Sequence, residues 1–151
     1  MRLVSVNVSL PRPVEFRGQA VSTSIFKEPV GGRVLARRLS LEGDWQADLR
    51  SHGGLNKAVY AYPREHYARW SQELGRDDLR PGQFGENLTV EGLTEETVRL
   101  GDVFRVGTGD AVELVEQSDA LTVWGLWHLV LVDKGDVEGA RRALGCPTLA
   151  R

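Results

Sequence analysis

Glycine interrupts this chain at short intervals, and the segments between the glycines are rich in β-branched and aromatic residues. The 151 residues include 17 glycines, and pairs such as Gly31-Gly32 are typical of tight turns. Segments this short suit strands of about four to eight residues better than long helices. The spacing therefore predicts a mostly-β fold built from many short strands.

Eight segments have the composition and alternation of strands. They are residues 3–8, 21–26, 32–39, 58–61, 87–90, 103–106, 112–115 and 127–132. No linker, internal repeat or low-complexity tract divides the chain. We therefore expect one domain over residues 1–151, folded as a closed or partly closed β-barrel.

Two other segments have the periodicity and end signals of helices. Residues 63–74 start at Pro63, which suits a first helical position, and are followed by Gly75, a typical C-terminal stop. Residues 136–144 start at Asp136 as N-cap, with a glycine just past the end. Both helices are short, so we expect them to be peripheral to the barrel.

Charge and cysteine content exclude several classes of protein. The net charge is -2 and the pI about 5.9, which argues against a nucleic-acid partner bound through phosphate neutralisation. No apolar run approaches the ~20 residues of a membrane span. The one cysteine, Cys146, cannot form an internal disulfide or a multi-cysteine zinc site. The start of the chain alternates like a strand rather than a signal peptide, so the sequence predicts a cytoplasmic protein.

A polar loop with two adjacent glycines is the first candidate site. Gly53 and Gly54 let a ligand approach the backbone and expose amide N–H groups, while His52 and Lys57 flank them with donors or positive charge. Such a loop suits an anion, for example a phosphate. Considered alone, it fits better a glycine turn with solvated polar neighbours, because two glycines near a lysine are a weak signal.

The second candidate is the stretch Phe84-Gly85-Glu86-Asn87. Gly85 permits a bent backbone, and the next two side chains offer acceptors and an amide. The alternative is a bulge that enters a strand, with Asn87 bonded to nearby backbone. Neither stretch decides a function by itself.

The ordered set of motifs is more specific than any one of them. It consists of Leu-Glu-Gly-Asp, His-Gly-Gly, Lys-Ala-Val-Tyr, Tyr-Pro-Arg-Glu-His-Tyr, Phe-Gly-Glu-Asn-Leu and Gly-Asp-Val-Phe, over about residues 1–116. This order and spacing resemble the MOSC family, named after the C-terminal domain of molybdenum cofactor sulfurases. The resemblance is strongest to the small stand-alone bacterial members.

The resemblance implies a MOSC-type β-barrel and a pocket for the molybdenum cofactor, molybdopterin. Related enzymes reduce N-hydroxylated bases and amidoximes at a molybdenum centre. By the family pattern, the implied cofactor-binding residues are Asp44, Gln46, His52, Gly53, Gly54, Lys57, Gly85, Glu86 and Asn87. Asp44 and Gln46 are expected to shape the floor of the pocket. We predict that the two loops converge around one cavity.

One family feature is missing. Catalytic MOSC proteins carry a cysteine after the strand that follows Gly-Asp-x-Phe, and its thiolate binds molybdenum or carries sulfur. Here Ser118 or Thr122 occupies that region, and a hydroxyl does not replace a thiolate. Cys146 lies well beyond it and is interpreted as a small apolar residue at a helix end. The alternative is that this segment folds back towards the pocket. No metal ligand is therefore assigned.

Three functions remain open at this point. The first is an oxidoreductase or sulfur-transfer domain that uses the molybdenum cofactor, with a small-molecule substrate and a redox partner protein. The second is a non-catalytic module that binds a pterin or another anion after losing the metal ligand. The third is a barrel with a new hydrolytic or ligand-binding role. The intact loops favour the first two, and the missing cysteine favours the second over the first.

Overall fold

The computed structural model describes residues 1–49, 53–54, 57–94, 96–99, 102–107, 111–118 and 126–131, the last two ranges as backbone only. The predicted helix over residues 136–144 lies outside the described residues, as do His52, Thr122 and Cys146.

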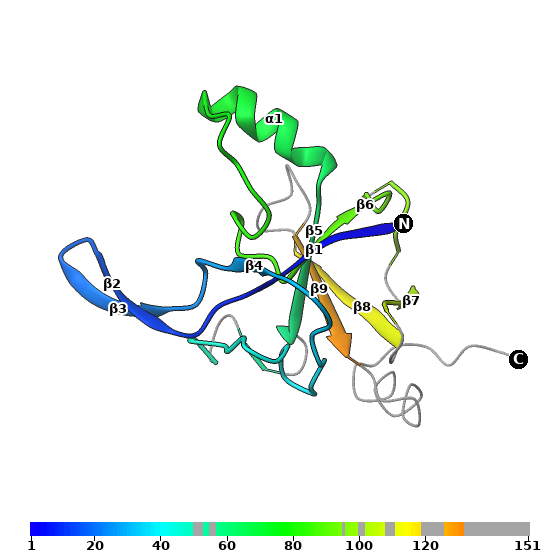
Figure 1. Ribbon diagram of the computed structural model, residues 1–151, viewed down its shortest axis with the longest axis horizontal. Coiled ribbons are helices and arrows are strands. Elements are labelled where there is room, and N and C mark those ends of the chain that lie inside the picture. Colours follow the sequence, from blue (N-terminus) through cyan, green and yellow to red (C-terminus); the bar gives the residue numbers. More distant parts are fainter. Residues whose placement is uncertain are drawn as a thin grey trace, which may run out of the picture.

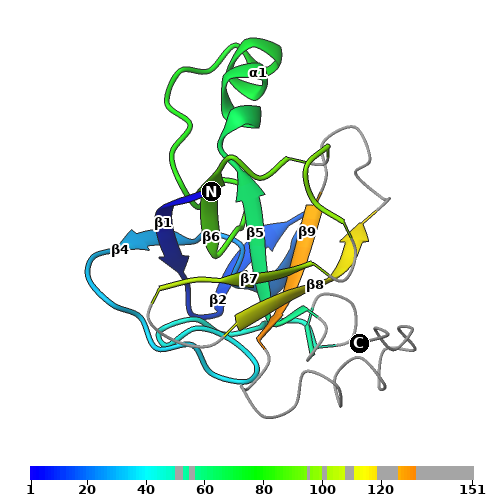
Figure 2. The same cartoon turned by 90° about the vertical axis from the view of Figure 1, so that its right-hand side faces the viewer.

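One mixed sheet of seven strands forms the body of the molecule (Figures 1 and 2). In spatial order the strands are β4 (Glu28–Val30), β1 (Arg2–Val8), β6 (Leu88–Glu91), β5 (Val59–Pro63), β9 (Leu126–Leu131), β8 (Ala111–Ser118) and β7 (Val103–Arg105). Neighbours are antiparallel except β5 and β6, which run parallel. A parallel pair needs a crossover between its strands, and the single described helix lies in it.

That helix is α1 (Glu65–Leu74), which stands at the carboxyl end of β5 (Figure 2). Gly75 ends it in the left-handed conformation, with φ 62°, as the sequence predicts. The predicted start is two residues early, because Pro63 is the last residue of β5 rather than the first of the helix.

A two-stranded hairpin extends away from the sheet (Figure 1). It consists of β2 (Arg12–Phe16) and β3 (Gln19–Thr23), paired antiparallel with Val14 opposite Val21. The sequence predicts only its second strand, and places that strand two residues too late. Sequence analysis does not predict β2, because the prolines at positions 11 and 13 argue against a strand. A proline is tolerated there because this hairpin has only edge strands.

The core lies where β1, β5 and β6 meet. Its buried apolar residues are Leu41, Ala58, Val59, Ala61, Leu88, Val90 and Val98. β5 is covered on both faces, since four of its five residues are buried. Tight packing of the central strands fixes the positions of the loops that lead into them.

Two predictions about the architecture need correction. Residues 32–39 form no strand; β4 comes earlier, and the chain then turns back through a single bridge between Ala36 and Leu41. The predicted closed barrel is not confirmed, because the edge strands β4 and β7 do not pair with each other among the described residues. Each has only three residues, too few for extensive pairing.

Among the described residues, no helix has the length and apolar character needed to cross a membrane.

Candidate functional site

Several segments meet where β5 and β6 begin and β1 ends. They are residues 24–27, 40–46 and 82–87, together with Gly53, Gly54 and Lys57 (Figure 2). The 40–46 segment contacts both candidate stretches, because Gln46 bonds to Gly54 and Lys57 and Asp44 bonds to Asn87.

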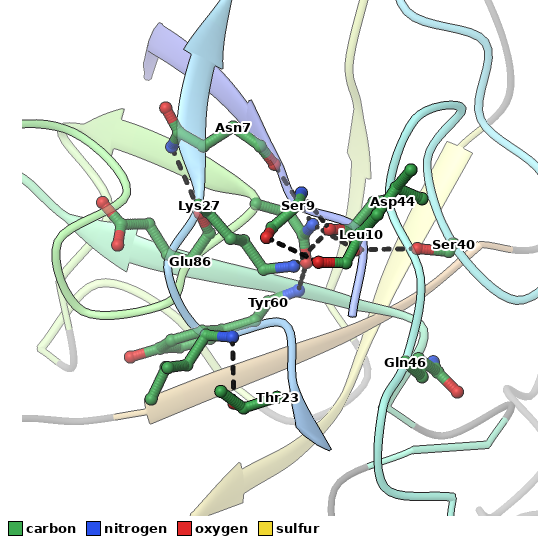
Figure 3. Close-up of polar contacts among 12 residues, drawn as sticks. Asn7, Ser9, Leu10, Thr23, Lys27, Ser40, Asp44, Gln46, Tyr60 and Glu86 are labelled. Atoms are coloured by element: carbon green, nitrogen blue, oxygen red, sulfur yellow. Dashed lines mark hydrogen bonds and ion pairs between the residues drawn. The ribbon is translucent and has the colours of Figure 1, made fainter. Parts of the chain in front are cut away.

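Asp44 is the centre of a buried polar network (Figure 3). Its carboxylate forms an ion pair with Lys27, and the two side chains are only 3% and 8% exposed. It also accepts hydrogen bonds from the Ser9 amide at 2.8 Å and the Ser40 hydroxyl at 2.8 Å. A buried carboxylate held by a cation and several donors is fully satisfied, so Asp44 serves to join segments.

Asn87 completes this network and uses both ends of its side-chain amide. Its Nδ2 donates to Asp44 at 2.9 Å, and its Oδ1 accepts from the Tyr60 amide at 3.1 Å. Its backbone also bonds to Asn7 and Tyr60, each at 2.7 Å. Asn87 therefore connects the start of β6 to β1 and β5 through hydrogen bonds, and its side-chain polar atoms are bonded inside the protein.

Glu86 is fully buried beside it and faces a different set of donors. Its carboxylate accepts from the Tyr67 hydroxyl, from the Gly82 amide at 2.8 Å, from the Phe84 amide at 3.1 Å and from Thr89 at 2.8 Å. These contacts close the 82–86 turn around the carboxylate. Glu86 is thus enclosed by its own turn and by α1.

Gln46 shapes the glycine loop. Its Oε1 accepts from the Gly54 amide at 2.7 Å, and its Nε2 lies within 3.3 Å of the carbonyl oxygens of Leu39, Gly54 and Lys57. A Cβ added at Gly53 would meet Gln46 Oε1 at 2.8 Å and the Asp48 carbonyl oxygen at 2.9 Å. Gly53 is therefore required because the backbone of Asp48 leaves no room for a side chain.

Gly54 differs from its neighbour. Its φ of 94° is a left-handed value that favours glycine, and a Cβ added there would meet no atom of the described residues within 4 Å. The expectation of two ligand-facing amides is thus wrong for Gly54, because Gln46 accepts that N–H. What the loop presents at Gly54 is an open backbone face beside the half-buried Lys57.

Burial changes the acid–base properties of two tyrosines near the site. Burial raises the pKa of Tyr67 above the usual tyrosine range, and the adjacent Glu86 charge raises it further. Burial also raises the pKa of Tyr60, with further contributions from Tyr62, Glu86 and Tyr67. Both phenols therefore keep their protons well above neutral pH, and the Tyr67 hydroxyl donates its proton to Glu86.

The structure thus divides the predicted site residues into two groups. Asp44, Gln46, Glu86 and Asn87 bond to the protein itself, whereas the loop around Gly54 and Lys57 has an open face. Gly85 belongs to the first group, since a Cβ there would lie 2.8 Å from Ile25. No group of three or more His, Cys, Asp or Glu in the described part of the chain could hold a metal ion. Ser118 is the last residue of β8.

Sequence analysis missed the partners of Asp44 and Asn87. Lys27, Ser9 and Ser40 bond to Asp44, and Asn7 bonds to Asn87; each is a common residue outside any motif. The alternation of the first strand gives one hint, because Asn7 is a polar residue between Val6 and Val8. Only the fold reveals that these residues meet.

Comparisons with known proteins agree with the observed fold. The model of the MOSC domain family matches residues 48–120. Protein YflK of Bacillus subtilis is 48% identical over 115 residues, which are 76% of this chain and 51% of YflK. Protein YiiM of Escherichia coli is 44% identical over 88 residues, which are 56% of this chain and 39% of YiiM.

A more distant relative and a solved structure extend the comparison. A protein of Gibberella moniliformis named reductase is 32% identical over 101 residues, 66% of this chain and 18% of that protein. The crystal structure of YiiM from Geobacillus stearothermophilus superposes with a TM-score of 0.63 at 27% identity, covering 87% of this chain and 68% of that one. The chain spans about half the length of YflK and a smaller share of the other two sequence relatives. From the family match, the relatives and the shared fold, this chain belongs to the MOSC domain family.

Proposed function

We propose that this chain is a molybdenum-cofactor-associated MOSC domain that binds the phosphate end of a molybdopterin at the loop of residues 53–57. The observation that carries the proposal is the open backbone face at Gly54, beside Lys57. Gln46 holds the Gly54 amide and the Lys57 carbonyl in place without a ligand. Backbone groups that are already held in this way lose little entropy when a ligand binds.

The chemistry of the loop suits a phosphate. A phosphate oxygen can approach closely where no Cβ is present, and Lys57 supplies a positive charge. Each charge-assisted contact of this kind contributes about 1.5–3 kcal/mol. The Asp44 side chain is almost fully buried, and the residue Glu86 is fully buried. Neither carboxylate therefore exposes a negative charge that would repel an anion.

A catalytic version of this function has a separate line of support. One relative is named reductase, and the resemblance to the MOSC family implies N-hydroxylated compounds as the substrates of such a reduction. The cofactor, when bound, would supply the molybdenum that exchanges electrons with substrate. The chain's own residues would hold its phosphate, and a cytoplasmic redox partner protein would deliver the electrons.

The non-catalytic version differs in one respect. It keeps the phosphate contacts but has no protein thiolate on the metal, because residues 112–118 contain no cysteine. If the catalytic version is right, the purified protein should retain molybdenum together with pterin. If the non-catalytic version is right, it should retain pterin with little molybdenum.

The test measures both components in protein purified from a host that makes the cofactor. We expect wild-type protein to retain pterin, measured by fluorescence after its release and oxidation, and Lys57→Ala to retain at least about tenfold less. The matched control is Arg69→Ala, which removes an exposed cation on α1 at the other end of the sheet. A wild-type protein without pterin, or equal loss in both variants, would contradict the proposal.

A molybdenum measurement on the same samples separates the two versions. Molybdenum close to the pterin content supports the catalytic version, and pterin without molybdenum supports the binding module. Cys146→Ser should leave both contents unchanged, and loss of molybdenum in that variant would identify Cys146 as the metal ligand.

A further inference from the structure

The hairpin of β2 and β3 has strand edges that the proposed function does not use. Among the described residues, these two strands form a sheet of their own, and neither pairs with a strand of the large sheet. The hairpin extends away from the rest of the fold (Figure 1). A two-stranded hairpin is at best marginally stable by itself in water, and an unpaired strand edge is a template for another strand. What this hairpin can bind therefore depends on its two edges.

The outer edge of β2 is blocked by proline. Pro13 has no N–H, and a proline in an edge strand turns that position towards solvent. Pro11 lies directly before the strand. An added strand would find no donor at either position. The edge of β2 is therefore protected against further pairing, as natural edge strands commonly are.

The outer edge of β3 has free donors and no charge. Pro13 lies opposite Ser22. The two residues of such an antiparallel pair either exchange two hydrogen bonds or both point away from each other, and proline has no N–H to exchange. The Ser22 amide therefore points outward, as does that of Ala20 two residues earlier. Residues 19–24 contain no charged side chain, so β3 presents an open edge without the charges that normally prevent strand pairing.

One face of the hairpin is apolar and exposed. Val14 lies opposite Val21, so the two side chains share a face, and Phe16 shares it because it lies two residues from Val14. Val21 is 41% exposed and Phe16 is 59% exposed. A second β3 strand, placed antiparallel with Val21 opposite its counterpart, would extend this face into a row of four valines. In the same register, the outward amides of Ala20 and Ser22 would meet carbonyls of the second strand.

We infer that β3 is a dimerisation edge, which pairs antiparallel with β3 of a second copy of this chain about a two-fold axis at Val21. The product is a four-stranded sheet in which both outer strands are β2. The prolines of β2 stop further addition, so association ends at the dimer instead of continuing as a fibre. A second copy suits this edge because pairing about Val21 joins neutral residues and places no like charges opposite each other.

A charge swap at Val21 tests the inference on the full chain by sedimentation equilibrium. We expect wild-type protein to dimerise. Val21→Lys or Val21→Glu alone should raise the dissociation constant at least about tenfold, because like charges then meet at the axis. Mixing the two variants should restore dimers, since opposite charges then face each other. The matched control is Val14→Lys, which places the same charge one strand away from the edge and should raise the dissociation constant far less.

Several outcomes would overturn the inference. A wild-type protein that stays monomeric at every concentration does not use β3 for dimerisation. Equal weakening by Val21→Lys and Val14→Lys, or no restoration on mixing, would mean that Val21 does not lie on a two-fold axis. Hydrogen exchange identifies a different occupant of the edge: if the Ala20 and Ser22 amides are protected in monomeric protein, another segment of the same chain covers β3. A dimer that only the mixture of charge variants restores supports the inference.

Discussion

The turn at residues 82–87 and the loop at residues 53–57 lie at the same end of the sheet and contain glycines in the left-handed conformation, yet they are built in opposite ways. At Gly82 a Cβ would come within 2.4 Å of the Lys27 carbonyl oxygen, whereas at Gly54 it would meet nothing within 4 Å in the part of the chain that the structure describes. The first turn closes on the buried Glu86 carboxylate. In the second, Gln46 accepts a hydrogen bond from the Gly54 amide, and no described residue fills the space beside Gly54.

This difference separates residues that build the site from residues that can contact a ligand. Both groups are polar and both stand in the family motifs, so residue type does not distinguish them. The distinguishing quantity is whether the hydrogen-bonding capacity of a side chain is already used inside the protein. By that measure Asp44, Glu86 and Asn87 build the site. Gly54 differs from them because the direction of its missing Cβ is open among the described residues.

The largest effect is expected from breaking the buried network. Asp44→Ala would leave Lys27 as an uncompensated buried charge, which costs about 3–5 kcal/mol in the free energy of unfolding. Glu42→Ala is the matched control, since Glu42 belongs to an exposed ion pair two residues earlier in the chain and should cost less than about 1 kcal/mol. Urea unfolding measures both values. Similar losses in the two variants would mean that the Asp44 network does not stabilise the fold.

An intermediate effect should separate the two glycines. Gly82→Ala forces both a left-handed alanine, at about 1–2 kcal/mol, and a clash with backbone, so we expect roughly 3 kcal/mol in total. Gly54→Ala carries only the conformational cost, so it should unfold at higher urea than Gly82→Ala. It should nevertheless reduce pterin retention, because its methyl group would occupy the open face. A Gly54→Ala protein with normal pterin content would show that the ligand does not approach there.

The sequence predicts the strand-rich composition, the helix stop at Gly75 and the family, because these depend on local patterns. It does not predict that residues 32–39 turn back at Ala36 and Leu41, since this depends on contacts that the segment makes elsewhere. For the same reason it groups Glu86 with the ligand-binding residues. The motif reveals that a carboxylate belongs at position 86, but only the fold shows Tyr67 and Thr89 beside it.

The smallest effect concerns the closed turn and depends on pH. Burial and the Glu86 charge raise the pKa of Tyr67, while in the unfolded chain a tyrosine ionises near pH 10, as usual. The folded protein therefore keeps a proton that the unfolded chain releases. The protonated Tyr67 therefore contributes to the free energy of unfolding. This contribution is complete below about pH 10 and declines as the pH rises above it.

Tyr67→Phe removes the hydrogen bond to Glu86 and should cost about 1.5 kcal/mol at neutral pH. Above pH 10 the gap between the two proteins should narrow, because only the wild type loses stability through this phenol. Urea unfolding of both proteins from pH 7 to pH 11 measures the gap, and Glu65→Gln, on the first turn of α1 away from Glu86, serves as control. A constant gap over this range would show that Tyr67 ionises alike in both states.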